Sequence, residues 1–267
     1  MADDLQTYHK DHWVEIEPER FARYDRMFKV DPRFAPKLLG PVAVAEGETV
    51  LDFGCGPGYV AVELARQVGP KGRVHAVDVN AEFVNRAAEV AREAGMAERI
   101  TFHHVLDERL PLADGTIDRI YCKNVLEYVP DLDHTLGELV RVLAPGGTLV
   151  ASDSDFGFVV VEPLSAEEVR ELFDAASPAF REPNVGRKLR GAYRRAGLGQ
   201  VRVDVNVQPD ERGNLRGVLE NMIGYGTRFG RMSEARAGEL RARLDTAIAD
   251  GEFFMALPQW WVRGVKP

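Results

Sequence analysis

The sequence predicts an α/β fold in which a mostly parallel, doubly wound sheet is covered by helices on both faces. Two observations support this prediction. Apolar strand-like segments alternate with amphipathic helical segments across residues 48–152, and this alternation is typical of a parallel sheet between helical layers. A glycine-rich turn, residues 54–58, follows the first strand and opens a helix. The chain has 267 residues, enough for one large domain with a sizeable core.

The elements of this predicted core follow one another regularly. We expect strands near 48–53, 73–78, 100–105, 117–122 and 147–152, and helices near 59–68, 81–94 and 132–143. Gly95 and the pair Gly146-Gly147 follow the last two of these helices, where glycine is a common stop signal.

The segments that flank the core have a different pattern. Residues 5–45 are polar and aromatic and predict two or three helices, interrupted near Pro32 and Pro36. After the fifth strand, the pattern predicts helices at 165–180 and 186–196, an alternating strand at 201–207, a helical stretch at 212–250 and a last strand at 259–265. We therefore divide the chain into an N-terminal helical lid (1–45), a core (46–210 and 257–267) and a helical insertion or cap (211–256).

Charge and composition argue against several classes of protein. The net charge is −8 and the pI is about 5.4, which disfavours a protein that coats nucleic acid. Cys55 and Cys122 lack metal-ligand spacing and are expected to be reduced thiols, which predicts a cytoplasmic location. The N-terminus lacks the features of a signal peptide, and no apolar run has the length of a membrane span.

The spacing of the glycines indicates which ligand the turn suits. In the dinucleotide-binding pattern G-x-G-x-x-G, the third glycine stands three positions after the second. Here the glycines are Gly54, Gly56 and Gly58, and Tyr59 occupies the position where that pattern needs a small residue. A turn without side chains lets the backbone pass close to a ligand. The shorter turn, preceded by Asp52, suits a ligand that carries an amine and no phosphate.

At this turn, the sequence resembles the class I methyltransferases that use S-adenosylmethionine. Residues 52–58 stand in the place of their first motif. Residues 122–131 are similar to the segment that follows their fourth strand, with Tyr128 where histidine is common, and residues 143–150 are similar to their turn into strand five. The resemblance covers about residues 45–155 and is nearest to the small-molecule, ubiquinone/menaquinone-methyltransferase-like group.

The resemblance implies a Rossmann-like sheet of seven strands, with the final strand antiparallel between its neighbours. It also implies S-adenosyl-L-methionine as cofactor and S-adenosyl-L-homocysteine as product. In the family, the first acid reaches the methionine amine directly or through water, and the backbone after strand four holds the methionyl tail. The expected cofactor-binding residues are Asp52, Gly54, Cys55, Gly56, Gly58, Asp78, Val79, Leu106, Asp107, Cys122 and Lys123.

Two of these acids follow later strands. Asp78 ends the second strand, where an ionised carboxylate can accept two hydrogen bonds from a ribose diol. A helix N-cap is the alternative role for Asp78, although Asn80 is itself a suitable cap. The resemblance implies that Val79 packs on the adenine face and that Asp107 accepts a hydrogen bond from the adenine amino group.

Methyl transfer from a sulfonium is an in-line displacement, so the protein mainly aligns the reactants and excludes water. An oxygen acceptor of high pKa also needs a base. The candidate bases are His9 and His12 in the N-terminal segment and Asp153 after the fifth strand, although exposed helix histidines and a structural aspartate are alternative interpretations. The sequence shows no metal-ligand cluster, which disfavours a metal-assisted reaction.

We expect the acceptor pocket to lie between the N-terminal helices and the cap. Its candidate substrate-binding residues are Tyr8, Trp13, Met222 and Tyr225. An aromatic and methionine lining suits a flat or apolar small molecule, but the same residues also suit core packing.

The sequence therefore predicts a methyltransferase acting on an O, N or C atom of a small molecule. An enzyme of the same fold that catalyses a non-methylating reaction, such as cyclisation, would carry the same cofactor motifs. Tyr59 disfavours an NAD-dependent oxidoreductase, and the intact acids Asp52, Asp78 and Asp107 disfavour a non-catalytic binding module. We expect a small-molecule acceptor, no nucleic-acid or membrane partner, and a monomer or homodimer.

Overall fold

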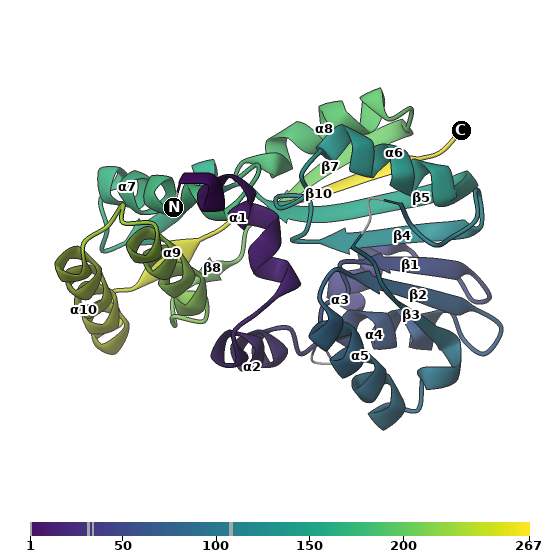
Figure 1. The fold of residues 1–267 in the computed structure, drawn as a ribbon, viewed down its shortest axis with the longest axis horizontal. Coiled ribbons are helices and arrows are strands. Elements are labelled where there is room, and N and C mark those ends of the chain that lie inside the picture. The colour runs from purple at the N-terminus through teal and green to yellow at the C-terminus, as the bar shows by residue number, and fades with distance from the viewer. Residues whose placement is uncertain (1, 31–32, 34, 107–108) are drawn as a thin grey trace.

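The computed structural model describes residues 2–30, 33, 35–106 and 109–267. Its centre is a seven-stranded sheet in the order β3-β2-β1-β4-β5-β10-β7 (Figure 1). The strands are β1 (Thr49–Phe53), β2 (Arg73–Asp78), β3 (Ile100–His104), β4 (Ile117–Lys123), β5 (Leu143–Ser154), β7 (Gly199–Asn206) and β10 (Gln259–Val265). Strands β1 to β5 pair in parallel, and β10 is antiparallel to both of its neighbours. The predicted topology is confirmed.

Helices cover both faces of this sheet, as alternation of strands and helices predicted. The covering helices are α3 (Ala35–Leu39), α4 (Tyr59–Gln67) and α5 (Ala81–Glu93) on one face, with α6 (Leu132–Val142) and α8 (Val185–Arg195) on the other (Figure 1). Residues that alternate along a strand enter different cores. Val50 packs with α4 in one hydrophobic core, whereas its neighbour Leu51 packs with α6 and α8 in the other.

A second body lies beyond the carboxyl ends of the central strands. It contains α7 (Ala166–Ala176), α9 (Arg216–Arg228) and α10 (Glu234–Asp250), together with a small sheet of β6 (Val160–Glu162), β9 (Phe254–Ala256) and β8 (Pro209–Asp210). The helices, β6 and β9 share one hydrophobic core, which is separate from the two cores of the central sheet. We call this whole second body the cap from here on, so the cap includes α7 and β6 in addition to the predicted insertion. The predicted helix over 212–250 is broken, because Ser233 caps a new helix by accepting a hydrogen bond from the Arg236 N–H.

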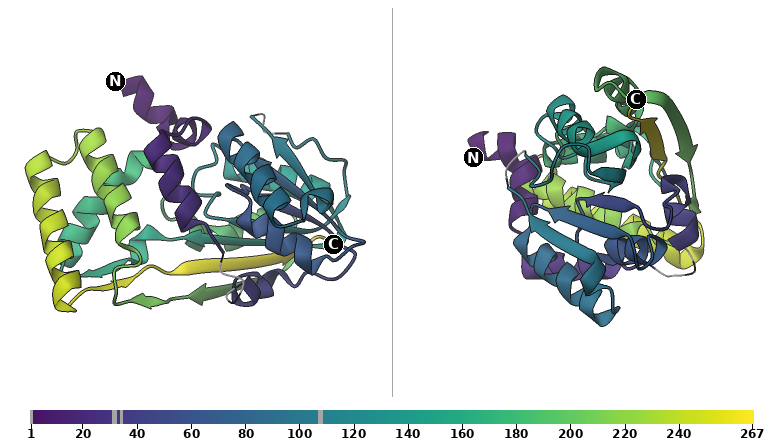
Figure 2. Two further views of the ribbon diagram at one scale, coloured as in Figure 1. Left: turned by 90° about the horizontal axis from the view of Figure 1, so that it is seen from below. Right: turned by 90° about the vertical axis from the view of Figure 1, so that its right-hand side faces the viewer.

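The N-terminal helices α1 (Ala2–Val14) and α2 (Pro18–Met27) bridge the two bodies (Figure 2). On the side of the sheet, the Asn80 amide Nδ2 donates to the carbonyls of Trp13 and Val14, at 3.0 and 3.2 Å. On the cap side, Arg23 Nη2 donates to Asn221 Oδ1 at 2.6 Å. No helix in the part of the chain that the structure describes is long and apolar enough to cross a membrane.

The glycine turn takes a backbone conformation that favours glycine. Gly54, Gly56 and Gly58 have φ angles of 77°, 50° and 82°. At Gly58, a Cβ atom would also lie 2.5 Å from the Cβ of Ala87 on α5. Two separate constraints therefore favour glycine at position 58: the positive φ angle and the close approach of α5.

This double requirement predicts a graded effect of alanine substitution. Gly146 also has a positive φ, of 78°, but a Cβ there meets nothing within 4 Å. We expect Gly146→Ala to lose about 1–2 kcal/mol of unfolding free energy from backbone strain alone. Gly58→Ala should lose about 1–3 kcal/mol more, because the clash with Ala87 adds overpacking. Urea denaturation of both variants measures the difference, and equal losses would contradict the proposed contact.

Candidate active site

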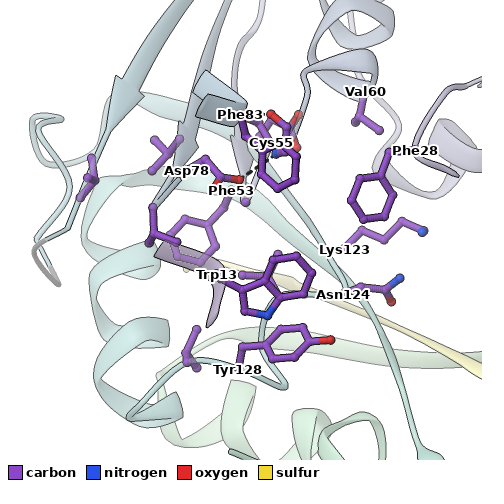
Figure 3. Close-up of a pocket in the computed structure, with 18 of the residues that line it drawn as sticks. Trp13, Phe28, Phe53, Cys55, Val60, Asp78, Phe83, Lys123, Asn124 and Tyr128 are labelled. Carbon is purple, nitrogen blue, oxygen red and sulfur yellow. Dashed lines mark hydrogen bonds between the residues drawn. The ribbon is translucent and has the colours of Figure 1, made fainter. Parts of the chain in front are cut away.

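A cavity of about 670 Å³ lies at the carboxyl ends of β1, β2 and β4. Its walls come from the glycine turn, the N-terminal helices and the loop that follows β4. Figure 3 shows Asp78 and Cys55 on one side, Lys123 and Asn124 on another, and Trp13 with Tyr128 below them. Ligands of open α/β sheets bind at this edge, outside the carboxyl ends of the strands.

Asp78 fixes the turn from the end of β2. Its Oδ2 accepts a hydrogen bond of 2.8 Å from the Gly56 N–H, and its Oδ1 accepts one of 2.9 Å from the Asn80 N–H. Burial raises the pKa of this carboxyl, while these two backbone donors act in the opposite direction. The cap of α5 is Asn80, whose Oδ1 accepts from the Phe83 N–H at 2.8 Å. The alternative role of Asp78 as the cap is thus filled by another residue.

Asp52 carries an unpartnered carboxylate oxygen in the cavity wall. The residue is only 3% exposed, and its Oδ2 has no hydrogen-bond partner among the described residues. Burial raises the pKa of Asp52 to about 8, with the nearby charge of Asp78 acting in the same direction. A buried acceptor without a donor is costly. A cationic or hydrogen-bond-donating ligand group would satisfy it.

Three side chains from the end of β4 add further polar groups to the wall. The Tyr121 hydroxyl and the Asn124 Oδ1 are buried without a partner in the described structure. The Lys123 ammonium makes no hydrogen bond or ion pair within the described chain, and burial lowers its pKa. Tyr121 stands directly beside Asp52 in the sheet register. Sequence reasoning missed both Tyr121, which precedes the motif at residues 122–131, and Asn124, which lies within that motif.

Apolar and aromatic side chains make up the rest of the wall. Trp13 lies 5.0 Å from Tyr128, ring centre to ring centre, with the rings tilted by 67° (Figure 3). Val79 and Leu106 line the cavity and are 40% and 63% exposed. Val79 was predicted on the adenine face and Leu106 as a cofactor-binding residue, and two exposed apolar side chains suit contact with a flat ligand surface. The predicted residue Asp107 lies outside the described residues.

The structure places the candidate base His12 behind the cavity wall. His12 is buried, contacts the Tyr8 carbonyl through Nδ1 and stacks on the Tyr8 ring at 4.7 Å. Because a carbonyl only accepts, Nδ1 carries the proton of the neutral ring and Nε2 holds the lone pair. That Nε2 has no partner among the described residues. Burial and the Arg20 charge lower the pKa of His12 to about 3.

The other predicted catalytic residues also lie away from the cavity surface. Asp153 is fully buried, and its Oδ1 accepts from the Val125 N–H at 3.1 Å, which ties down the loop after β4. Burial raises the pKa of Asp153 to about 7. His9 is buried on α1. None of these three side chains is among the described residues that line the cavity.

The predicted acceptor residues divide between two surroundings. Trp13 lies in the cavity wall. Tyr8, Met222 and Tyr225 instead belong to the hydrophobic core of the cap. Tyr225 remains connected to the lid, because its hydroxyl accepts a 3.2 Å hydrogen bond from Arg20 Nη2. The described residues contain no group of three or more His, Cys, Asp or Glu side chains that could hold a metal ion.

This strand order, together with a glycine-turn cavity at the carboxyl edge of the sheet, defines the class I methyltransferase fold. Comparison with solved structures supports this assignment of the fold. A SAM-dependent methyltransferase from Aquifex aeolicus is 25% identical, covers 72% of this chain and 92% of its own, and gives a TM-score of 0.54. The [4+2]-cyclase SpnF is 21% identical, covers 88% of this chain and 81% of its own, and gives a TM-score of 0.54. The second likeness concerns the fold alone.

Residues 45–191 match the family described as "Methyltransferase domain", and the chain belongs to this family. Methyltransferase GfsG from Streptomyces halstedii is 33% identical over 129 residues, which are 48% of this chain and 46% of that protein. The ubiquinone/menaquinone biosynthesis C-methyltransferase UbiE from Klebsiella pneumoniae is 35% identical over 181 residues, 67% of this chain and 66% of that protein. The match thus spans about half to two thirds of these relatives.

The burial of His12 predicts a specific loss of stability in acid. Its pKa is about 3 in the folded protein, against an ordinary value of 6.5. Below about pH 6.5 the unfolded chain therefore binds a proton that the folded protein excludes, so stability falls as the pH decreases towards 3, by at most about 1.4 kcal/mol per pH unit. Urea denaturation at several pH values should show a shallower acid slope for His12→Phe. Parallel slopes for the two proteins would refute this effect.

Proposed function

We propose that the protein is an S-adenosylmethionine-dependent methyltransferase that methylates an O, N or C atom of a small molecule. The observation that carries this proposal is the cavity itself. It joins a glycine-rich turn, an acid at the end of β2 and an unpartnered buried carboxyl group, that of Asp52. Membership of the methyltransferase-domain family supports the same activity. A cytoplasmic location remains a prediction from cysteine usage.

The polar groups of the cavity fit an adenosyl amino acid. Asp52 would accept from the methionine ammonium, and Asp78 would accept from the ribose hydroxyls. The backbone of Gly54, Gly56 and Gly58 would pass under the amino-acid tail. We assign the Lys123 ammonium to the tail's carboxylate, because Lys123 lies on the side of the cavity away from Asp78 (Figure 3). Asp52 and Lys123 together offer the opposite charges of a zwitterion.

Val79 and Leu106 provide the apolar surface for the adenine ring in this assignment. Cys122, at the end of β4 beside Phe53 in the register, is fully buried and is not among the described residues that line the cavity, so in this assignment its backbone would act by positioning Lys123. These assignments place the adenine ring at one end of the cavity and the charged amino-acid tail at the other. The methyl group to be transferred would then lie between them, near Trp13 and Tyr128.

The residues of this chain would act mainly by alignment and exclusion of water. When bound, the cofactor supplies a methyl group already activated by positive sulfur. The lid helices cover the cavity, and Trp13 and Tyr128 together present an aromatic surface to a flat acceptor. For an acceptor that must lose a proton, His12 has a lone pair on Nε2, but its pKa of about 3 makes it a weak base, so it stands only as one of three candidates. His9 and Asp153 remain alternative candidates for that step.

A second candidate function is cyclisation on the same fold; the likeness to the [4+2]-cyclase SpnF concerns the fold alone. An enzyme that binds the cofactor but cyclises its substrate would keep the same turn and acids. Incubation with methyl-labelled S-adenosylmethionine and candidate acceptors separates the two. Label in the product supports methyl transfer, whereas an altered but unlabelled product supports cyclisation.

The ribose assignment predicts the effect of replacing Asp78. Asp78→Asn keeps the size of the side chain but removes its charge, so S-adenosylhomocysteine should bind more weakly by about 1–3 kcal/mol, the scale for lost charged hydrogen bonds. Isothermal titration calorimetry measures the change. Asp250→Asn, an exposed substitution at the end of α10, serves as the matched control and should bind like the original protein. Unchanged affinity in Asp78→Asn would remove Asp78 from the ribose site.

The raised pKa of Asp52 predicts that cofactor affinity depends on pH. With a pKa of about 8 in the folded protein, Asp52 is mostly protonated at neutral pH and must release a proton before it can pair with an ammonium. Affinity for S-adenosylhomocysteine should therefore rise between about pH 6 and 7.5, by up to about tenfold per unit. Asp52→Asn should bind weakly with little pH dependence over this range. Titrations in which both proteins respond equally to pH would exclude Asp52 as the partner.

A further inference from the structure

Strand β7 forms an open edge of the large sheet. In the strand order it stands last, with β10 on its inner side and no described strand on the other. Figure 2 shows it running along the outside of the molecule, next to β10. Arg202, Asp204, Val205 and Asn206 are all exposed. The backbone groups that alternate residues of β7 direct away from β10 therefore face solvent.

Natural edge strands are protected from edge-to-edge association by proline, charged side chains, bulges or a covering segment. Strand β7 carries the charges of Arg202 and Asp204, and its pairing with β10 is irregular between Arg263 and Val265, so a strand that pairs with this edge must match those charges. Strand β7 has 8 residues, and it contains neither proline nor lysine. Its sequence alternates valine with polar residues as far as Val207, a pattern with high strand propensity. The edge is therefore suited to pair with another strand.

The charges on β7 have no partners within the described chain. In the pairing with β10, Arg202 stands directly opposite Arg263, and like charges in this position destabilise a sheet. Neither arginine forms an ion pair or side-chain hydrogen bond with the described residues, and the same is true of Asp204. Arg202 thus lies beside the like charge of Arg263. Asp204, two residues further along β7, points to the same face of the sheet as Arg202.

We propose that two copies of this chain form a dimer by antiparallel pairing of their β7 strands about a two-fold axis at Val203. In this arrangement, Arg202 of each copy stands opposite Asp204 of the other, twice in the dimer. Residues opposite each other in an antiparallel pair lie on the same face, about 4.5–5.5 Å apart between Cβ atoms. The two sheets would join into one continuous sheet with an isologous interface.

The charges of Arg202 and Asp204 favour this register over the registers shifted along the strand. A two-fold axis at Arg202 would place Arg202 opposite itself, and an axis at Asp204 would place Asp204 opposite itself. Both arrangements bring like charges together, which costs free energy. An axis between two residues would pair side chains that point to opposite faces of the sheet. Only the axis at Val203 pairs opposite charges on one face.

The same register covers exposed apolar surface. Val205 is 49% exposed and stands beside Trp260 of β10, on which Phe158 packs at 5.9 Å between ring centres. Phe158 is itself 53% exposed. In the proposed dimer, Val205 of one copy lies opposite Val201 of the other, so two valine pairs lose contact with water. The hydrophobic and electrostatic terms favour the same arrangement.

The oligomeric state in solution tests this inference with charge-reversed variants. Sedimentation velocity of the full chain should show a dimer. Arg202→Asp and Asp204→Arg should each weaken the dimer by about tenfold or more, because each converts both opposite-charge pairs into like-charge pairs. An equimolar mixture of the two variants should form a heterodimer, since every charge pair is then complementary again.

Two exposed residues of the cap helices supply matched controls. Arg170→Asp on α7 and Asp250→Arg at the end of α10 make the same changes in net charge away from β7, and both variants should dimerise like the original protein. Thermal melting of every variant confirms folding. A monomeric original protein, a dimer insensitive to both β7 variants, or a mixture that remains monomeric would each overturn the proposed interface. None of these outcomes depends on the proposed catalytic activity.

Discussion

The hydrogen bond from the Gly56 N–H to Asp78 Oδ2, 2.8 Å long, ties the glycine turn to the end of β2. The second oxygen of the same carboxylate accepts from the Asn80 N–H. One side chain therefore orders both strand-to-helix connections that frame the cavity. A side chain at position 54 would collide with Val125, and one at position 58 would collide with Ala87. The turn can occupy this place because glycines allow these close approaches.

Asn80, which donates its N–H to Asp78, also connects this part of the site to the N-terminal lid. Its Oδ1 caps α5, while its Nδ2 holds the carbonyls at the end of α1. On the opposite side, Tyr8 of α1 lies in the hydrophobic core of the cap. The lid is thus attached to two bodies with separate cores. Trp13, at the end of α1, stands where those attachments meet, so the width available to an acceptor depends on how the two bodies are spaced.

Local patterns predicted most of the sheet, because its longer strands and helices each carry their own periodic signal. The small sheet of the cap was not predicted, since strands of two or three residues are too short to show alternation. Within the site, Asp52 and Asp78 follow from motif spacing. Tyr121 could not be predicted, because it enters the cavity wall only through the register that places it beside Asp52, and register is a property of the folded sheet. His12 was expected near the cofactor, yet its burial beneath Tyr8 depends on packing that the sequence does not encode locally.

The charged groups that line the cavity indicate which kind of ligand it binds. Burial raises the pKa of Asp52 and lowers that of Lys123, so the surroundings disfavour both charged forms. A ligand with one charge would stabilise one of these groups and leave the other unfavourable. A zwitterionic tail would stabilise both charges at once, because its ammonium would pair with Asp52 and its carboxylate with Lys123, whose charged form Asp153 and Glu127 also favour. The preference for a ligand without phosphate follows the same logic, since Asp52 and Asp78 both line the cavity beside the glycine turn and neither would stabilise a phosphate there.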